Sequence, residues 1–281
     1  MIEIIKKSIP NAIKYGKLND AQLQKAITKY EKRIISLSKN SAKQVIPHCF
    51  YDWISLAIQN NKKAVGFLSF IDSECVYAIS HTNLRFHKNI RTIIESIILT
   101  MDTNTSIENN PTYLNFIGEL IGLNYILKNG NDKFELVEIE KKLPNKKQAD
   151  FVFKDKSTNE LLYVDFISIH NIDPSKSVND TELIAFLENR FNVKLGSKTT
   201  NLSEDFHKLN LPNNCKVNFA ILPIIWTELN TLIPFINTFK SIDEKYANVF
   251  RCCSILSQID EDGIYHYSFC SVYSVLNLWK N

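Results

Sequence analysis

One carboxylate inside an apolar run places the tightest constraint on how this chain can fold. Residues 161–169 read Leu-Leu-Tyr-Val-Asp-Phe-Ile-Ser-Ile, and apolar side chains occupy both alternating faces of the run. Such a run is typical of a central β-strand that is covered on both sides. Asp165 lies in its middle, and burying a charged carboxylate costs several kcal/mol unless it is paired, hydrogen-bonded or bound to a cation. The fold must therefore bring donors or a cation to Asp165.

Two further carboxylates have apolar neighbours in the same part of the chain. Asp150 lies in a run rich in strand-forming residues, 148–154, and Glu119 lies on a helix expected over 111–128. If the two strands are hairpin neighbours and the helix packs across them, the three acids can converge on one point. Converging carboxylates repel one another, and a hard divalent cation such as Mg²⁺ or Mn²⁺ relieves that repulsion.

Each of the three acids also has a structural interpretation. The alternative for Glu119 is a solvated or lysine-paired position on a helix edge, and for Asp150 a strand end that faces solvent. The alternative for Asp165 is a carboxylate satisfied by backbone or hydroxyl donors. The order and spacing of the three acids together favour the shared metal site.

A change in element type divides the chain. The first hundred residues show mainly helical periodicity, and a polar, turn-like segment at 102–110 follows. Beyond it the expected order is αβββαβ, then a further helix and a β-hairpin. Strands are expected over 134–139, 148–154, 161–169, 216–224, 251–259 and 264–274. A helix capped by Asp180 is expected to have Gly196 near its end, and a short helix is expected over 229–240. The sequence predicts a mixed α+β (α/β) chain with a mainly helical region, 1–108, and a second domain, 109–281.

Local signals place several helix ends. Asn19 followed by Gln22 predicts an N-cap and a capping box. Asn110 followed by Pro111 predicts the start of the first helix of the second domain. Residues 64–80 are apolar without a clear period, so helix and strand both remain open there.

Charge and cysteine usage limit the class of protein. The chain carries 33 Lys and Arg residues against 30 Asp and Glu residues, so any nucleic-acid surface would have to be local. Its six cysteines lack CxxC or zinc-ligand spacing, which favours buried free thiols in a reducing cytoplasm over disulfides. The N-terminus lacks the apolar core of a signal peptide, and no run is long enough to span a bilayer. We expect a soluble, cytoplasmic protein.

The element order and the three acids resemble the PD-(D/E)xK nuclease superfamily, which has the restriction-endonuclease-like fold. The resemblance covers roughly residues 111–225. It implies that Asp150 and Asp165 bind Mg²⁺ (or Mn²⁺) and that Glu119 completes the site. Ala149 replaces the usual proline, and Asp165 replaces the usual glutamate on the third strand.

The resemblance also implies a lysine two residues after the third-strand acid, where this chain has Ile167. Some members of the superfamily supply this lysine from the next helix. Lys194, on the apolar side of the helix that Asp180 caps, and Lys198, just beyond Gly196, are the candidates. A solvated surface position is the alternative for each.

Lys154, on the same strand face as Asp150, is a third candidate for this lysine. His170, at the end of the third strand, could serve as a base but ranks lower, because it lies on the strand face opposite Asp165. Four lysines flank the turn before the Asp150 strand and could meet phosphates, although a solvated turn is the commoner explanation: Lys141, Lys142, Lys146 and Lys147.

These residues predict metal-dependent phosphodiester hydrolysis of nucleic acid, with DNA as the expected substrate. The region 1–108 would contact the substrate or a protein partner. The alternative, which Ile167 favours, is a catalytically inactive module of the same fold that binds nucleic acid or a protein partner. A third interpretation makes the helical region an adaptor in a defence or mobile-element system. The sequence leaves open whether the chain forms a homodimer.

Overall fold

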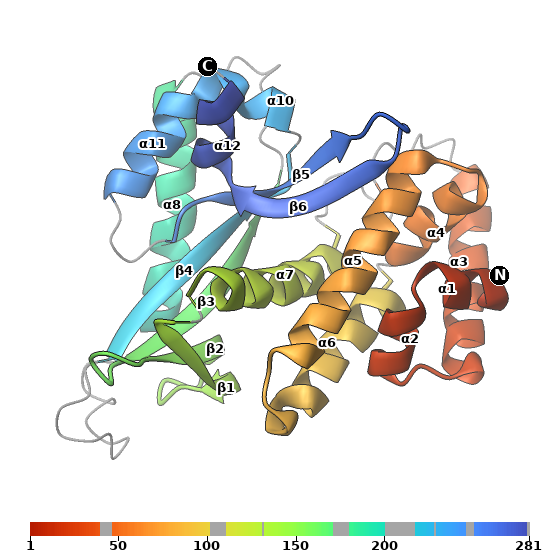
Figure 1. The fold of residues 1–281 in the computed structure, drawn as a ribbon, viewed down its shortest axis with the longest axis horizontal. Helices are drawn as coiled ribbons and strands as arrows, with labels where there is room; N and C mark the ends of the chain where they lie inside the picture. Colours follow the sequence, from red (N-terminus) through yellow and green to blue (C-terminus); the bar gives the residue numbers. More distant parts are fainter. Residues whose placement is uncertain are drawn as a thin grey trace. The chain divides into compact units, whose positions relative to one another are not determined.

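The computed structural model of this protein is a mixed α+β structure whose six-stranded sheet has the order β1-β2-β3-β4-β5-β6 (Figure 1). The structure describes residues 1–39, 47–101, 111–130, 132–170, 180–199, 217–227, 229–245 and 250–279. The chain forms two compact units: unit 1 comprises Met1–Asn124 and Ser257–Ser268, and unit 2 comprises Tyr125–Leu256 and Phe269–Asn281. The mixed α+β class is confirmed, whereas the boundary expected after residue 108 lies outside the described residues.

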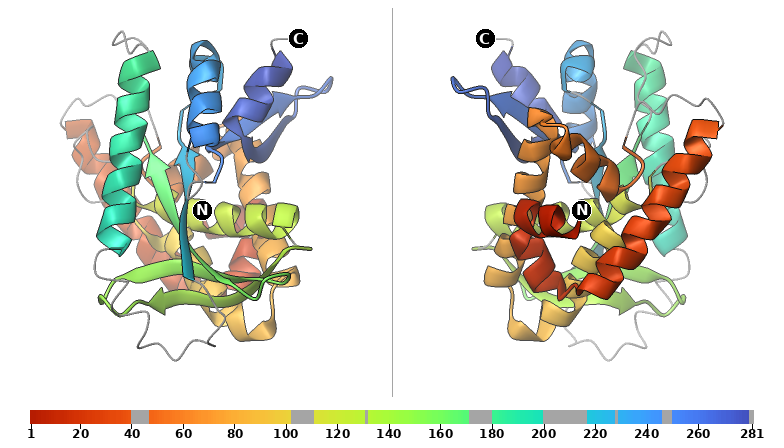
Figure 2. Two further views of the ribbon diagram at one scale, coloured as in Figure 1. Left: turned by 90° about the vertical axis from the view of Figure 1, so that its left-hand side faces the viewer. Right: turned by 90° about the vertical axis from the view of Figure 1, so that its right-hand side faces the viewer.

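Helices make up most of unit 1 (Figure 1 and Figure 2). In chain order they are α1 (Ile2–Ser8), α2 (Pro10–Gly16), α3 (Asp20–Lys39), α4 (Phe50–Ile58), α5 (Lys62–Ser80), the 3₁₀ helix η1 (Leu84–Phe86), α6 (His87–Leu99) and the first part of α7 (Tyr113–Gly130). Residues 64–80, which the sequence left open, lie in α5. Asn61 caps this helix by accepting a hydrogen bond from the N–H of Ala64 at 3.0 Å.

The capping box predicted at the start of α3 is confirmed. Asn19 Oδ1 accepts a hydrogen bond from the N–H of Gln22 at 2.9 Å, and Gln22 Oε1 accepts one from the N–H of Asn19 at 3.0 Å. Two backbone donors at the helix start are thereby satisfied reciprocally.

The start of α7 differs from the expectation. The helix begins at Tyr113 rather than at Pro111, and Asn110 lies outside the described residues. The Tyr113 hydroxyl accepts a hydrogen bond from the Trp53 indole at 2.9 Å and donates one to the carbonyl of Pro47 at 3.0 Å. These bonds tie the first turn of α7 to the segment around α4.

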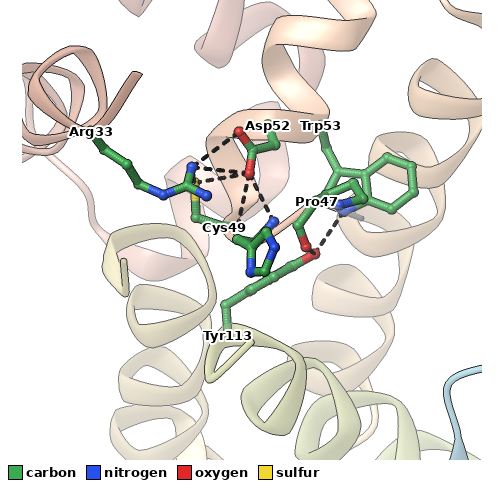
Figure 3. A network of polar contacts seen from close by, with 7 residues as sticks. Arg33, Pro47, Cys49, Asp52, Trp53 and Tyr113 are labelled. Carbon is green, nitrogen blue, oxygen red and sulfur yellow. Dashed lines mark hydrogen bonds and ion pairs between the residues drawn. The ribbon is translucent and has the colours of Figure 1, made fainter. Parts of the chain in front are cut away.

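A buried polar network centred on Asp52 lies beside that contact in unit 1 (Figure 3). Asp52 forms a buried ion pair with Arg33, whose Nη1 lies 3.2 Å from Oδ2. The same carboxylate accepts hydrogen bonds from the backbone N–H groups of His48 (2.8 Å) and Cys49 (3.2 Å) at the start of α4. Burial raises the pKa of the Cys49 thiol to about 12, so this thiol stays protonated and unreactive. The network therefore has a structural role.

The tip of the C-terminal hairpin belongs to unit 1, where it packs on α5. A Cβ atom built on Gly66 would lie 2.2 Å from the carbonyl oxygen of Tyr265, so only glycine allows this approach. The Tyr267 hydroxyl donates a hydrogen bond to the carbonyl of Lys63 at 3.2 Å. Its ring meets that of Phe67 edge-on, with 5.6 Å between the centroids.

Antiparallel and parallel pairings follow one another across the sheet. Its strands are β1 (Phe134–Lys142), β2 (Gln148–Asp155), β3 (Leu161–Ile169), β4 (Val217–Ile225), β5 (Cys253–Ile259) and β6 (Tyr265–Ser271). β1 and β2 pair antiparallel, as do β2 and β3, whereas β3 pairs parallel with β4 and β4 parallel with β5. The strands expected over 148–154 and 161–169 are confirmed, and β1 continues from Ile139 to Lys142.

One helix of unit 2 lies along the sheet and buries an apolar stripe against it (Figure 2). The helices of this unit are α8 (Asp180–Thr199), α10 (Leu229–Leu232), the 3₁₀ helix η4 (Ile233–Phe235), α11 (Ile236–Lys245), α12 (Val272–Trp279) and the last part of α7. Leu187 and Phe191 of α8 share a core with Tyr163 of β3 and Ile221 of β4. All four side chains are almost completely buried, so this layer fixes α8 on the sheet.

Gly196 was expected near the end of its helix, and α8 ends three residues later at Thr199. Two element limits in unit 2 correct the sequence-based expectations. The helix expected over 229–240 is interrupted by a 3₁₀ turn that contains Pro234 and then continues as α11. The strand expected up to residue 274 ends at Ser271, where α12 begins.

Two further observations concern the expected class of protein. Among the described residues, no helix combines the length and the apolar character that crossing a membrane requires. The five cysteines within the described residues are all free thiols, and four of them are buried.

Candidate functional site

Asp150 and Asp165 occupy facing positions on neighbouring strands of unit 2. β2 and β3 pair antiparallel up to Phe151 opposite Val164. One step further along each strand are Asp150 and Asp165, which the register therefore places opposite one another. Like charges at directly opposed positions destabilise a sheet, so this arrangement requires compensation.

Each carboxylate takes the place of a backbone partner on the other strand. The N–H of Asp150 donates to Asp165 Oδ1 at 3.1 Å, and the N–H of Phe166 donates to Asp150 Oδ2 at 2.8 Å. These reciprocal bonds satisfy backbone donors where the regular ladder between the two strands ends. They also fix both side chains, because each is bonded to the strand opposite its own.

Two lysines of α8 neutralise Asp165, whose side chain is completely buried. Lys194 Nζ lies 3.1 Å from Asp165 Oδ2, and Lys198 Nζ lies 2.7 Å from the same oxygen. Neither ammonium group is aligned for a hydrogen bond to Oδ2, so both contacts are ion pairs. Lys198 Nζ is also bonded to the carbonyl of Gln148. We call Asp150, Asp165, Lys194 and Lys198 the acid–lysine cluster.

The sequence of α8 explains why both lysines reach the sheet. Leu187, Phe191, Lys194 and Lys198 follow one another at three- and four-residue spacing, which places them on one side of the helix. The first two are buried in the core, whereas the lysine side chains keep 27% and 16% of their surface exposed. The stripe therefore changes from apolar to basic where the sheet beneath it becomes acidic.

A turn that the sequence did not single out as part of the site holds the end of α8. Asn145, between β1 and β2, donates a hydrogen bond from Nδ2 to the carbonyl of Lys198 at 2.9 Å. Its Oδ1 accepts one from the N–H of Lys147 at 3.1 Å. Pro144 and Asn145 together predict a turn. No local pattern indicates that this turn contacts the end of α8 at Lys198, 53 residues further along the chain.

Burial and the neighbouring charges shift the pKa of Asp150. Burial, followed by the charge of Asp165, raises the pKa of Asp150 to about 6. The charge of Lys194, the hydrogen bond from Phe166 and the charge of Lys198 act in the opposite direction. Two carboxylates thus share a site with two ammonium groups, and burial favours the protonated form of Asp150.

The remaining predicted residues lie elsewhere. Glu119 belongs to unit 1, so its placement beside the acid–lysine cluster stays a prediction. Lys154 lies opposite Leu161 at the far end of the β2–β3 pairing from Asp150. His170 stacks on Trp226 with 6.1 Å between the ring centroids, and burial lowers its pKa to about 4. Ile167 packs against the core beneath α8.

Asp150 is the acid of the cluster with an oxygen left for a ligand. Its Oδ1 has no partner among the described contacts, whereas Asp165 Oδ2 contacts both ammonium groups and Asp165 Oδ1 accepts the N–H of Asp150. Within the described part of the chain, no three His, Cys, Asp or Glu side chains form a metal-binding group.

No protein-family model, curated protein or solved structure matches this chain, so its function has to be inferred from the geometry of the acid–lysine cluster.

Proposed function

We propose that this protein is a metal-dependent nuclease with a restriction-endonuclease-like core, which hydrolyses phosphodiester bonds of DNA. The contact of Lys194 and Lys198 with Asp165 carries the proposal. The third strand has Ile167 where such a site needs a lysine, and α8 brings two ammonium groups to the acid from another direction. These lysines come from the helix after the third strand, from which some members of the resembled superfamily supply the missing lysine.

The topology of unit 2 supports the same proposal. Three antiparallel strands, β1 to β3, are followed by α8 and then by β4, which pairs parallel with β3. With α7 before β1, this gives the αβββαβ order. The two acids lie where β2 and β3 cease to pair, and Asp150 Oδ1 has no described partner there.

In this proposal Asp150 and Asp165 hold Mg²⁺ or Mn²⁺, and Glu119 supplies a third ligand or orients the attacking water. The bound cation would activate that water and neutralise charge that develops on the phosphate. Lys194 is the better candidate for contact with the scissile phosphate, because it is the more exposed lysine and its described partner is Asp165 alone. Lys198 is held by Gln148 and keeps Asp165 oriented.

Cleavage assays on plasmid and single-stranded DNA with Mg²⁺, Mn²⁺ or EDTA test the proposal. Asp165→Asn and Lys194→Met should each lower the rate roughly 100-fold or more, since each removes a group that stabilises charge in the transition state. Lys240→Met, at an exposed position of α11, is the matched control and should cleave like the wild type. Equal cleavage by Asp165→Asn and the wild type would remove the proposed site.

One observation favours the alternative, an inactive module that binds nucleic acid or a protein. The cluster neutralises itself, because two lysines face Asp165 and a backbone N–H binds Asp150. Calorimetric titration with Mn²⁺ separates the two functions. Binding that Asp150→Asn abolishes supports the nuclease, whereas no heat at any accessible concentration supports the inactive module.

A further inference from the structure

We propose that the turn between β1 and β2 binds the phosphate backbone of duplex DNA next to the acid–lysine cluster. Its contacts would come from three side chains, which we call the lysine turn: Lys142, Lys146 and Lys147. The inference rests on the proposed function, because it assigns the surface that aligns the substrate of that site.

The lysine turn is positively charged and open to solvent. Lys142, Lys146 and Lys147 are all exposed, and no ion pair involves any of them within the described structure. Lys141 is different, because its Nζ lies 2.7 Å from Glu138 Oε2. Unpaired lysines on a surface bind phosphates and release the condensed counterions of DNA.

The backbone of the turn is held in one conformation. The N–H of Leu143 donates to the carbonyl of Lys147 at 2.8 Å, and the N–H of Lys146 donates to the carbonyl of Leu143 at 2.9 Å. Asn145 ties the same turn to the carbonyl of Lys198. A surface that is already ordered loses little conformational entropy when a ligand binds.

The distance between the lysine turn and the acid–lysine cluster fits a DNA strand that contacts both. Lys147 lies three residues before Asp150, a span of about 10 Å in an extended strand. This span corresponds to about three nucleotides at the axial rise of one DNA strand. The hydrogen bond from Asn145 to the carbonyl of Lys198 orders the turn and also holds the end of α8. The lysine turn and the acid–lysine cluster are therefore fixed by the same hydrogen bond.

Salt-dependent binding tests the proposal without requiring catalysis. A fluorescently labelled duplex is titrated with protein in EDTA at several KCl concentrations, and log K is plotted against log [KCl]. The triple variant Lys142→Gln, Lys146→Gln, Lys147→Gln should reduce the magnitude of the slope by about 2.7, since each phosphate contact contributes about 0.9.

The chain offers a matched control outside the helical region 1–108. Lys133, Lys240 and Lys245 each take part in an ion pair, so their triple replacement by glutamine removes the same charge from ammonium groups that already have a carboxylate partner. This control should keep the wild-type slope. An equal change in both triple variants, or no change in either, would overturn the lysine turn as a binding surface, and so would binding of single strands alone. Thermal melts by circular dichroism confirm that both variants are folded.

The two proposals can fail separately. Wild-type protein that binds with the lysine-dependent slope but cleaves no DNA in Mg²⁺ or Mn²⁺ would overturn the nuclease and keep the lysine turn. Cleavage by a protein whose slope does not depend on these lysines would keep the nuclease and overturn the lysine turn.

Discussion

At the scale of single residues, Asp150 and Asp165 are like charges held at facing positions of a sheet. Charge neutralisation by α8 and backbone donors from the opposite strand compensate the repulsion. The compensation is unequal, because both ammonium groups contact Asp165. Burial, followed by the charge of Asp165, raises the pKa of Asp150 to about 6, so the protonation of Asp150 changes near neutrality.

The first prediction concerns this response. Burial and the charge of Asp165 raise the pKa of Asp150 from 3.8 to about 6, so the folded state binds more protons than the unfolded state between these values. The unfolding free energy should therefore fall as pH rises through this window. One pKa unit corresponds to about 1.4 kcal/mol, and partial exposure reduces the effect, so we expect a loss of about 1–2 kcal/mol.

Urea unfolding of the wild type and of Asp150→Asn between about pH 4 and pH 7 measures this contribution. Asp243, whose pKa burial also raises to about 6, is present in both proteins and cancels in the comparison. Parallel pH profiles for the two proteins would contradict the assignment.

The second prediction concerns Asn145, which ties the turn before β2 to the end of α8. Asn145→Ala removes the hydrogen bond to the carbonyl of Lys198 and should cost about 1 kcal/mol. Hydrogen exchange should become faster in the last turn of α8 than around the buried Leu187. Asn192→Ala, at an exposed position of the same helix, is the control and should leave that exchange pattern unchanged.

The residues of the acid–lysine cluster could be predicted from the sequence, but the hydrogen bond from Asn145 that holds the end of α8 could not. A buried acid in an apolar strand requires hydrogen-bond donors or a cation as its partner. The three- and four-residue spacing in α8 places Lys194 and Lys198 on the same side of the helix as its apolar residues. The bond from Asn145 depends on where a turn and a helix end meet in three dimensions. No local pattern encodes that meeting.

At the scale of elements, the central strands were easier to predict than the last elements of the chain. β2 and β3 are runs of strand-forming residues separated by a polar turn, so their limits were predictable from the sequence. The segment that forms α12 contains Val272, Tyr273 and Val275, which favour strands by intrinsic propensity. Burial of Val272 and Leu276 at helical spacing in the core outweighs that propensity.

The third prediction contrasts two glycines, one on α5 and one on α8. Gly66→Ala would place a methyl group against the carbonyl oxygen of Tyr265, and this clash with backbone should cost about 1–3 kcal/mol. In Gly196→Ala, at an exposed position of α8, the added methyl group meets no atom within 4 Å. It should add about 0.5–1 kcal/mol of stability through helix propensity. Unfolding midpoints in urea that shift in the same direction for both variants would contradict this difference.

At the scale of the whole molecule, the chain passes between its two units inside α7 and again on either side of the hairpin tip. The partner of that tip, α5, lies about two hundred residues earlier in the chain, as the bond between Lys63 and Tyr267 shows. The contact between the hairpin tip and α5 cannot be predicted from the sequence, because the residues of the tip have the composition of an ordinary exposed turn. A linear division near residue 108 was therefore the natural expectation, and it separates the hairpin tip from its support.

The last prediction follows from this connectivity. In a fragment that spans 109–281, Tyr265 and Tyr267 lose their contacts with Gly66, Phe67 and Lys63, and the tip loses what orders it. Chymotrypsin should therefore cleave after these tyrosines much faster in the fragment than in the full chain, because proteolysis follows the population of locally open states. Mass spectrometry of the early products measures both rates, with cleavage after buried Tyr163 as the internal reference for global unfolding. Equal protection of the tip in both proteins would show that the hairpin is ordered without α5.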